Sequence, residues 1–118
     1  MPAFRASNTD IWRSAFFPSN FDVWIEKIYG ATYVSGTNNG SNNWTVALLK
    51  NDTAFGQTSM GSFNTSADTA SVLTPHSAAV NAALGAATNP SVSILVTKTS
   101  GPASVLMMCQ VSYRLNLT

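Results

Sequence analysis

The C-terminal stretch SVSILVTKTSGPASVLMMCQVSYRLNLT, residues 91–118, decides the fold class. In its first part, Val92, Ile94 and Val96 occupy every second position, which is the period of a β-strand with one buried face. Ser100-Gly101-Pro102 is a turn signal. Apolar residues then alternate with polar ones to the C-terminus, which predicts a second, long strand; these residues are Val105, Met107, Cys109, Val111, Tyr113, Leu115 and Leu117.

Two residues interrupt the polar face of that last strand. Leu106 and Met108 stand where a strand with one face in water would carry polar side chains. We therefore predict that this side of the strand is covered too, by a contact with another subunit.

The sequence before residue 91 also reads as strands and turns. Segments 24–35, 44–50 and 57–63 are rich in β-branched and aromatic residues or alternate in polarity, and polar loops separate them. Gly30 inside the first segment predicts a bulge or bend. Residues 71–88 fit period 2 but carry the alanine content of a helix, so residues 77–88 stay open between strand, loop and short helix. Seven or eight strands without a long helix indicate an all-β, antiparallel sandwich or barrel over 24–118.

Residues 1–23 have a different character. Bulky side chains follow one another without a strand or helix period, and Pro2 and Pro18 limit regular elements. We expect an irregular N-terminal arm that either covers its own domain or docks on a neighbouring protein. Trp, Phe and Arg anchor interfaces, and the candidate contacts in the arm are Phe4, Arg5, Trp12, Arg13, Phe16 and Phe17.

The composition excludes several classes of protein. Of 118 residues only 9% are charged and 45% are hydrophobic, and the net charge is +1. A disordered chain would be less hydrophobic and more charged, and a nucleic-acid or lipid-surface binder would carry a basic patch. A single Cys allows no internal disulfide. No leader or membrane-spanning segment is recognisable, so we expect synthesis in a cytoplasm.

Catalytic chemistry finds no support in the sequence. His76 is the only His, no Gly-x-Ser-x-Gly motif accompanies it, and a structural or exposed position is the simpler interpretation. Asp52 and Asp68 stand in turn contexts and are better explained as turn residues than as paired catalytic acids. No metal-binding or phosphate-binding motif is present, so we predict no metal and no cofactor. Cys109 falls on the apolar face of the last strand and is expected to be an inert core thiol.

A sugar site is the alternative. Trp44 beside Asn42 and Asn43 has the residue types of a carbohydrate-binding loop, but Trp44 also continues the apolar face of Val46 and Leu48. The sequence leaves both interpretations open.

Three blocks carry a resemblance to a known family. They are ATYVSGTNNGSNNWTVAL (31–48), GSFNTSADT (61–69) and VTKTSGP (96–102). In strand and loop style they resemble the small jelly-roll sandwiches of tailed-phage virion proteins, which serve as capsid cement (decoration) proteins and as domains of head or tail fibres. The resemblance covers residues 24–118 and implies a jelly-roll-like β-sandwich without catalytic residues.

The resemblance also implies partners. The expected function is that of a capsid cement protein: a homotrimer on the outer capsid surface that binds and stabilises the major capsid protein, with a terminal arm gripping its neighbours. The alternative is a carbohydrate-binding or receptor-binding module of a phage fibre. Neither nucleic acid nor a membrane is an expected partner.

Overall fold

We describe the fold from a computed structural model of the chain. The described backbone comprises residues 4–6, 10–16, 22–51, 57–84 and 91–116, and the described side chains are those of 22–50, 58–84 and 92–115. These residues form eight strands and no helix: β1 (Phe4–Ala6), β2 (Asp10–Phe16), β3 (Asp22–Val34), β4 (Asn43–Asn51), β5 (Gln57–Asn64), β6 (Thr74–Ala83), β7 (Ser91–Thr99) and β8 (Val105–Asn116).

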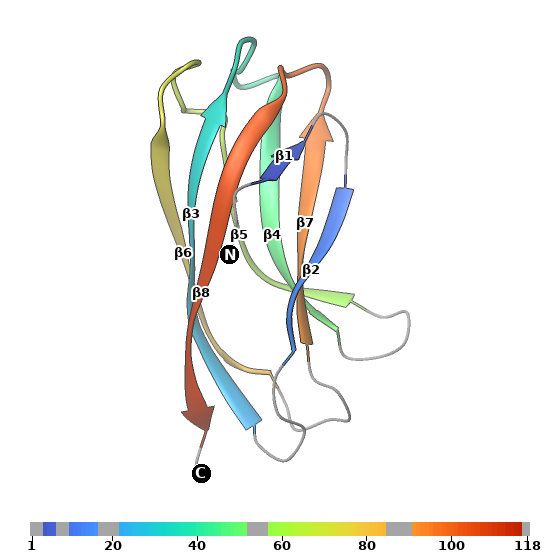
Figure 1. The fold of residues 1–118 in the computed structure, drawn as a ribbon, viewed down its shortest axis with the longest axis vertical. Coiled ribbons are helices and arrows are strands. Elements are labelled where there is room, and N and C mark those ends of the chain that lie inside the picture. Colours follow the sequence, from blue (N-terminus) through green and yellow to red (C-terminus); the bar gives the residue numbers. More distant parts are fainter. Residues whose placement is uncertain (1–3, 7–9, 17–21, 52–56, 85–90, 117–118) are drawn as a thin grey trace.

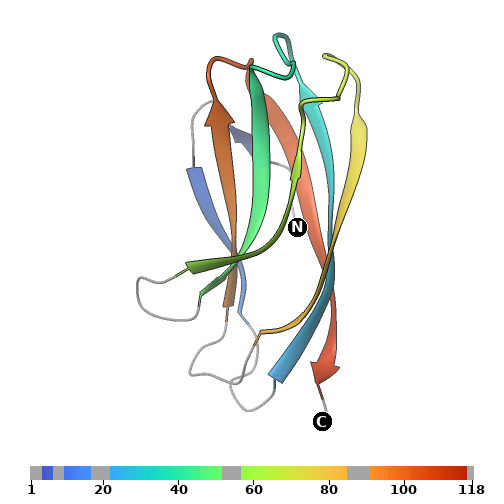
Figure 2. The same cartoon turned by 180° about the vertical axis from the view of Figure 1, so that it is seen from behind.

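The strands form two sheets that face each other (Figures 1 and 2). The first sheet has the order β1-β8-β3-β6 and the second the order β2-β7-β4-β5. All pairings between neighbouring strands are antiparallel, and β1 pairs with β8, β2 with β7, β3 with β6 and β4 with β5. The first half of the chain therefore runs against the second half as one long hairpin rolled into a sandwich. This is the jelly-roll arrangement, so the predicted all-β sandwich is confirmed.

The core lies between the sheets and consists of alternate residues of each strand. Ile25 and Ile28 from β3 and Met107 and Cys109 from β8 face Trp44 and its neighbours on the second sheet, all with at most 2% exposure. Leaving water stabilises each large apolar side chain by about 1.5–3 kcal/mol. The predicted inward row of β8 is buried from Val105 to Cys109, whereas Tyr113 and Leu115 at its far end are exposed.

The ambiguous segment 71–88 is a strand over Thr74–Ala83. Its residues alternate between half-buried and exposed, and Thr74, His76 and Ala78 pair with Thr32, Gly30 and Ile28 of β3. Pairing with a full-length neighbouring strand outweighs the weak helix propensity of an alanine-rich run, since β3 offers a complete ladder of hydrogen bonds. Residues 85–90 lie outside the described residues.

The expectation of an irregular arm is wrong for two of its segments. β1 pairs with β8, and β2 pairs with β7 from Asp10↔Val96 to Phe16↔Ser91. Both are edge strands, one in each sheet. A register shift between Arg13 and Ala15 interrupts the alternation of β2, and β1 has only three residues, so neither strand leaves a period-2 pattern in the sequence.

The bulge predicted at Gly30 is also misplaced. Gly30 pairs regularly with His76 on one side and Cys109 on the other. The irregularity of β3 lies between Ile25 and Lys27. Glu26 is the extra residue opposite β8, whereas opposite β6 the extra residue is in β6, where Val80 and Asn81 together face Glu26. Among the described residues, no helix is long and apolar enough to cross a membrane.

Candidate functional site

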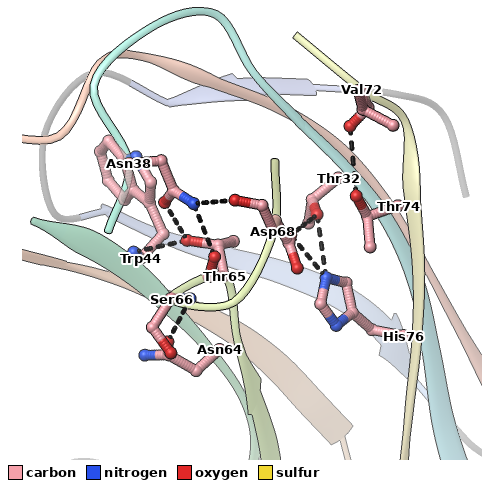
Figure 3. Close-up of polar contacts among 10 residues, drawn as sticks. All are labelled: Thr32, Asn38, Trp44, Asn64, Thr65, Ser66, Asp68, Val72, Thr74 and His76. Carbon is pink, nitrogen blue, oxygen red and sulfur yellow. Dashed lines mark hydrogen bonds and ion pairs between the residues drawn. The ribbon is translucent and has the colours of Figure 1, made fainter. Parts of the chain in front are cut away.

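A cluster of buried polar side chains joins the β5–β6 loop to the first sheet (Figure 3). His76 Nε2 lies 2.8 Å from Asp68 Oδ2 and 3.0 Å from Thr32 Oγ1, and Thr32 Oγ1 donates a hydrogen bond of 2.8 Å to the same Asp68 oxygen. Thr32 is 1% exposed, and the side chains of Asp68 and His76 are 6% and 13% exposed. The pairing of β3 with β6 brings Thr32 and His76 together, because His76 lies opposite Gly30, two residues along β3 from Thr32.

A second set of contacts holds the same loop to the β3–β4 loop. Asn38 Nδ2 donates to the backbone carbonyl oxygens of Thr65 and Asp68 at 2.7 and 2.9 Å, and Thr65 Oγ1 donates to Asn38 Oδ1 at 2.8 Å. The Trp44 amide in turn donates to Thr65 Oγ1 at 3.0 Å. Buried polar groups stabilise a structure only when they are paired, and here the pairs fix two loops at one end of the sandwich (Figure 3).

The geometry of this cluster does not match nucleophilic catalysis. In a Ser-His-Asp triad the acid and the nucleophile bind opposite ring nitrogens of the His, whereas here Asp68 and Thr32 both contact Nε2. The hydroxyl of Thr32 is also buried out of reach of a substrate. Among the described residues no group of three or more His, Cys, Asp or Glu side chains could hold a metal ion.

The residues proposed for sugar binding are structural. Trp44 is completely buried, and its Nε1 donates a hydrogen bond of 2.8 Å to the Ala103 carbonyl oxygen. Asn43 is 6% exposed and its Nδ2 donates to the carbonyl oxygens of Asn39 and Gly40. Asn42 Oδ1 accepts from the Gly101 amide. Of the two interpretations left open for Trp44, the structure shows the core position, and a ring in the core cannot stack on a sugar.

The outer face of the first sheet carries an exposed apolar patch. Residues that pair across antiparallel strands point to the same face, and the register places Tyr33 beside Leu106 and Ala31 beside Met108. We call Tyr29, Ala31, Tyr33, Leu106 and Met108 the apolar outer patch. Tyr29 and Met108 are 43% and 47% exposed, and Tyr33 and Leu106 are each 37% exposed.

A hollow lies in the middle of this patch. It has a volume of about 260 Å³, and its lining residues come only from β3 and β8: Tyr29, Gly30, Ala31, Met108, Cys109 and Gln110. Since no residue of the second sheet contributes, the hollow opens outward, between the side chains of Tyr29 and Met108. The short side chain of Ala31 is part of its lining.

On the three longer strands of this sheet, charge is confined to one end. Between the pair Tyr33–Leu106 and the pair Tyr29–Gln110, β3 and β8 contain no charged residue, and neither does the part of β6 that pairs with this stretch of β3. Lys27, Glu26 and Arg114 lie further along the strands, where Arg114 Nε is 3.4 Å from Glu26 Oε1 and its guanidinium stands over the Trp24 ring. The face is therefore divided into an apolar half and a charged half.

The predicted contact residues are described to different extents. Leu106 and Met108 lie on the outer face and are exposed in the single chain, and their predicted cover by another subunit stays a prediction. In β1, Arg5 pairs with Leu106 at the margin of the patch. The side chains of Phe4, Arg5, Trp12, Arg13 and Phe16, and all of Phe17, lie outside the described residues.

Tyr29 and Tyr33 were missed as members of the patch. Their signal was present in the sequence: they alternate with Ile28, Thr32 and Val34 and so had to point away from the core. No protein-family model matches the chain, and neither the curated proteins nor the solved structures gave a significant match.

Proposed function

We propose that this chain is a structural protein of a tailed-phage virion: a capsid cement protein that binds the outer surface of the major capsid shell and stabilises it without catalysing a reaction. The observation that carries the proposal is a jelly-roll sandwich that exposes large apolar side chains, and such a surface can contact the shell or further copies of this chain. Exposed apolar surface of this kind marks a site of contact with other proteins.

The polar cluster supports a role in assembly rather than in chemistry. Asp68, His76 and Thr32 satisfy one another, and their geometry places no nucleophile next to a substrate-sized opening. The buried thiol of Cys109 is equally unsuited to reaction, since burial raises its pKa to about 11. Both groups stabilise the sandwich, which agrees with a protein that acts by binding.

The virion setting rests on three further points. The jelly roll recurs in viral capsid proteins, although a fold alone does not establish a function. The resemblance of blocks 31–48, 61–69 and 96–102 to phage virion proteins points the same way. A surface of Ser, Thr and Asn with few charges also suits dense packing of identical copies, because like charges would repel.

The proposed partners are the major capsid protein and further copies of this chain. The arm residues Phe4, Arg5, Trp12, Arg13, Phe16 and Phe17 are proposed to contact the capsid or a neighbouring subunit. Deleting the arm would not test this cleanly, because β1 and β2 supply a strand to each sheet. Substitutions such as Arg5→Ser and Phe17→Ser, which leave the backbone pairing in place, are the better variants.

Capsids assembled without this protein provide the test. The purified chain is expected to sediment with them to a saturating ratio, and Arg5→Ser with Phe17→Ser is expected to lower the bound fraction at least about ten-fold, or about 1.4 kcal/mol. Leu115→Ser, on an exposed residue at the far end of β8, is the control and should bind like the original chain. An original chain that does not sediment with the capsids contradicts the proposal.

A further inference from the structure

The apolar outer patch needs a partner with an uncharged surface. Tyr29, Tyr33, Leu106 and Met108 together expose on the order of 400 Å², which is as much as the largest apolar patches on typical monomers. The rows that contain them carry no charged residue on β8, β3 or β6, and the charged residue at their margin is Arg5 of the edge strand β1, which pairs with Leu106. A partner of opposite charge would gain nothing from this half of the face, so electrostatic complementarity does not explain it.

A second copy of the chain fits these conditions. In a two-fold contact each surface faces itself, so a charged patch would repel its own copy, whereas an uncharged one does not. Sheets stack face to face about 10 Å apart within sandwiches, and two outer faces can do the same. The charged half with Lys27, Glu26 and Arg114 then lies at the edge of the contact, where water solvates it.

The shape of the patch is also self-complementary. Tyr29 and Met108 project on either side of the hollow over Ala31. When one copy is turned by 180° onto the other about an axis that passes just beside the hollow, a side chain from the rim of each copy faces the hollow of its partner. Large side chains that fill central, desolvated pockets contribute most of the binding energy of an interface.

The area that two such patches bury lies at the lower limit for a specific contact. Two patches buried together remove roughly 800 Å² of mainly apolar surface, and the surrounding Pro75, Ser77 and Gln110 bring the total toward the roughly 1,200 Å² of the smallest specific interfaces. Leu73, the most exposed large apolar residue at 64%, directly precedes β6. Its place two residues before Pro75 extends the same face.

From these observations we propose that the outer face of the β1-β8-β3-β6 sheet is a two-fold contact between two copies of this chain, centred on the hollow over Ala31. The inference does not depend on the capsid proposal, because the contact forms between isolated chains. It assigns a use to Tyr29, Ala31 and Tyr33 as well as to Leu106 and Met108.

Ala31 and Ala79 offer a matched pair of substitutions. Both are alanines on the outer face of this sheet, on neighbouring strands, but Ala31 lines the hollow and Ala79 pairs with Lys27 in the charged half. Ala31→Arg fills the hollow and adds a charge at the centre of the proposed contact. Ala79→Arg adds the same side chain outside it. Circular dichroism and thermal unfolding check that both variants keep the fold.

Light scattering coupled to size-exclusion chromatography, over a dilution series, measures the mass. The original chain and Ala79→Arg are expected at twice the 12.5 kDa chain mass, and Ala31→Arg at the mass of one chain, with an at least about ten-fold weaker association. A monomeric original chain overturns the inference, as does a trimer that Ala31→Arg leaves intact. A monomer that still binds capsids, but loses this binding on Ala31→Arg, would assign the patch to the capsid instead and would leave the proposed function standing.

Discussion

Gly30 lets the two sheets pack closely, because it leaves room for a side chain of the opposite sheet. A Cβ atom at this position would meet Cζ and Cε1 of the Phe63 ring, the latter at 2.9 Å. That ring is 8% exposed and stacks on His76 with a centroid distance of 4.8 Å and an interplanar angle of 6°. The glycine in β3 therefore makes room for an aromatic side chain of β5, rather than for a bend in its own strand.

Gly30→Ala is predicted to lower the free energy of unfolding by about 1–3 kcal/mol, because it overpacks the contact with Phe63. Urea denaturation measures the change. Gly40→Ala is the control, since nothing lies within 4 Å of a Cβ there, and it should change stability by less than about 0.5 kcal/mol. Phe63→Leu combined with Gly30→Ala should recover part of the loss. A neutral Gly30→Ala would contradict the account of this contact.

Cys109 links burial to pH. The thiol is 2% exposed, and desolvation raises its pKa from 9.0 to about 11. Between these values the unfolded chain releases the thiol proton while the folded chain keeps it, so stability falls as the pH rises. Its contribution is complete below pH 9 and is lost on passing pH 11.

The free energy of unfolding of the original chain should therefore drop more steeply from pH 9 to pH 11 than that of Cys109→Val, by on the order of 2 kcal/mol. Comparing the two chains removes the contribution of every other group that titrates in this range. Parallel stability curves for the two chains would show that the thiol does not remain protonated in the folded state.

At the scale of elements, the β5–β6 loop depends on contacts that are distant in sequence. Asp68 receives hydrogen bonds from residues on two different strands, Thr32 and His76, and Asn38 of another loop binds its backbone oxygen. These contacts hold a loop that ends at the exposed Leu73. Polar groups thus position this loop, although its last residue before β6, Leu73, is apolar and exposed.

Asp68→Ala leaves the buried Thr32 hydroxyl and the His76 ring without their acceptor. An unpaired buried polar group costs about 1–3 kcal/mol, so we expect a loss of stability in this range and faster proteolytic cleavage within residues 65–73. Glu26→Gln is the comparison: its ion pair with Arg114 is largely exposed, and pairs of that kind contribute about 1 kcal/mol or less. Equal effects of the two substitutions would show that the Asp68 cluster contributes no more than a surface ion pair.

The sequence predicted some elements and not others for physical reasons. Apolar residues at every second position of β7, and of β8 as far as Cys109, lie in the core, so the sequence shows the alternation. The same alternation identifies Leu106 and Met108 as exceptions. β1 and β2 are edge strands held by backbone pairing, one very short and one with a register shift, and backbone pairing leaves no side-chain period. The meeting of Thr32, Asp68 and His76 depends on which strands pair, which no local pattern contains.

At the scale of the whole molecule, each end and face of the sandwich has its own character. Polar loops are tied together at one end, where the β3–β4, β5–β6 and β7–β8 connections lie side by side (Figures 1 and 2). The outer face of the first sheet divides into an apolar and a charged half. The low charge of the chain thus leaves one broad surface that can pack against protein without expelling ions or breaking ion pairs.

We propose above all that this protein acts by binding to the outer surface of a capsid. Electron microscopy of particles assembled with and without the protein tests it most directly. We expect additional density at regular positions on the outer surface when the protein is present, of a size that matches whole copies of the sandwich. Particles that look identical in the two preparations, although the folded protein is present in excess, would contradict it.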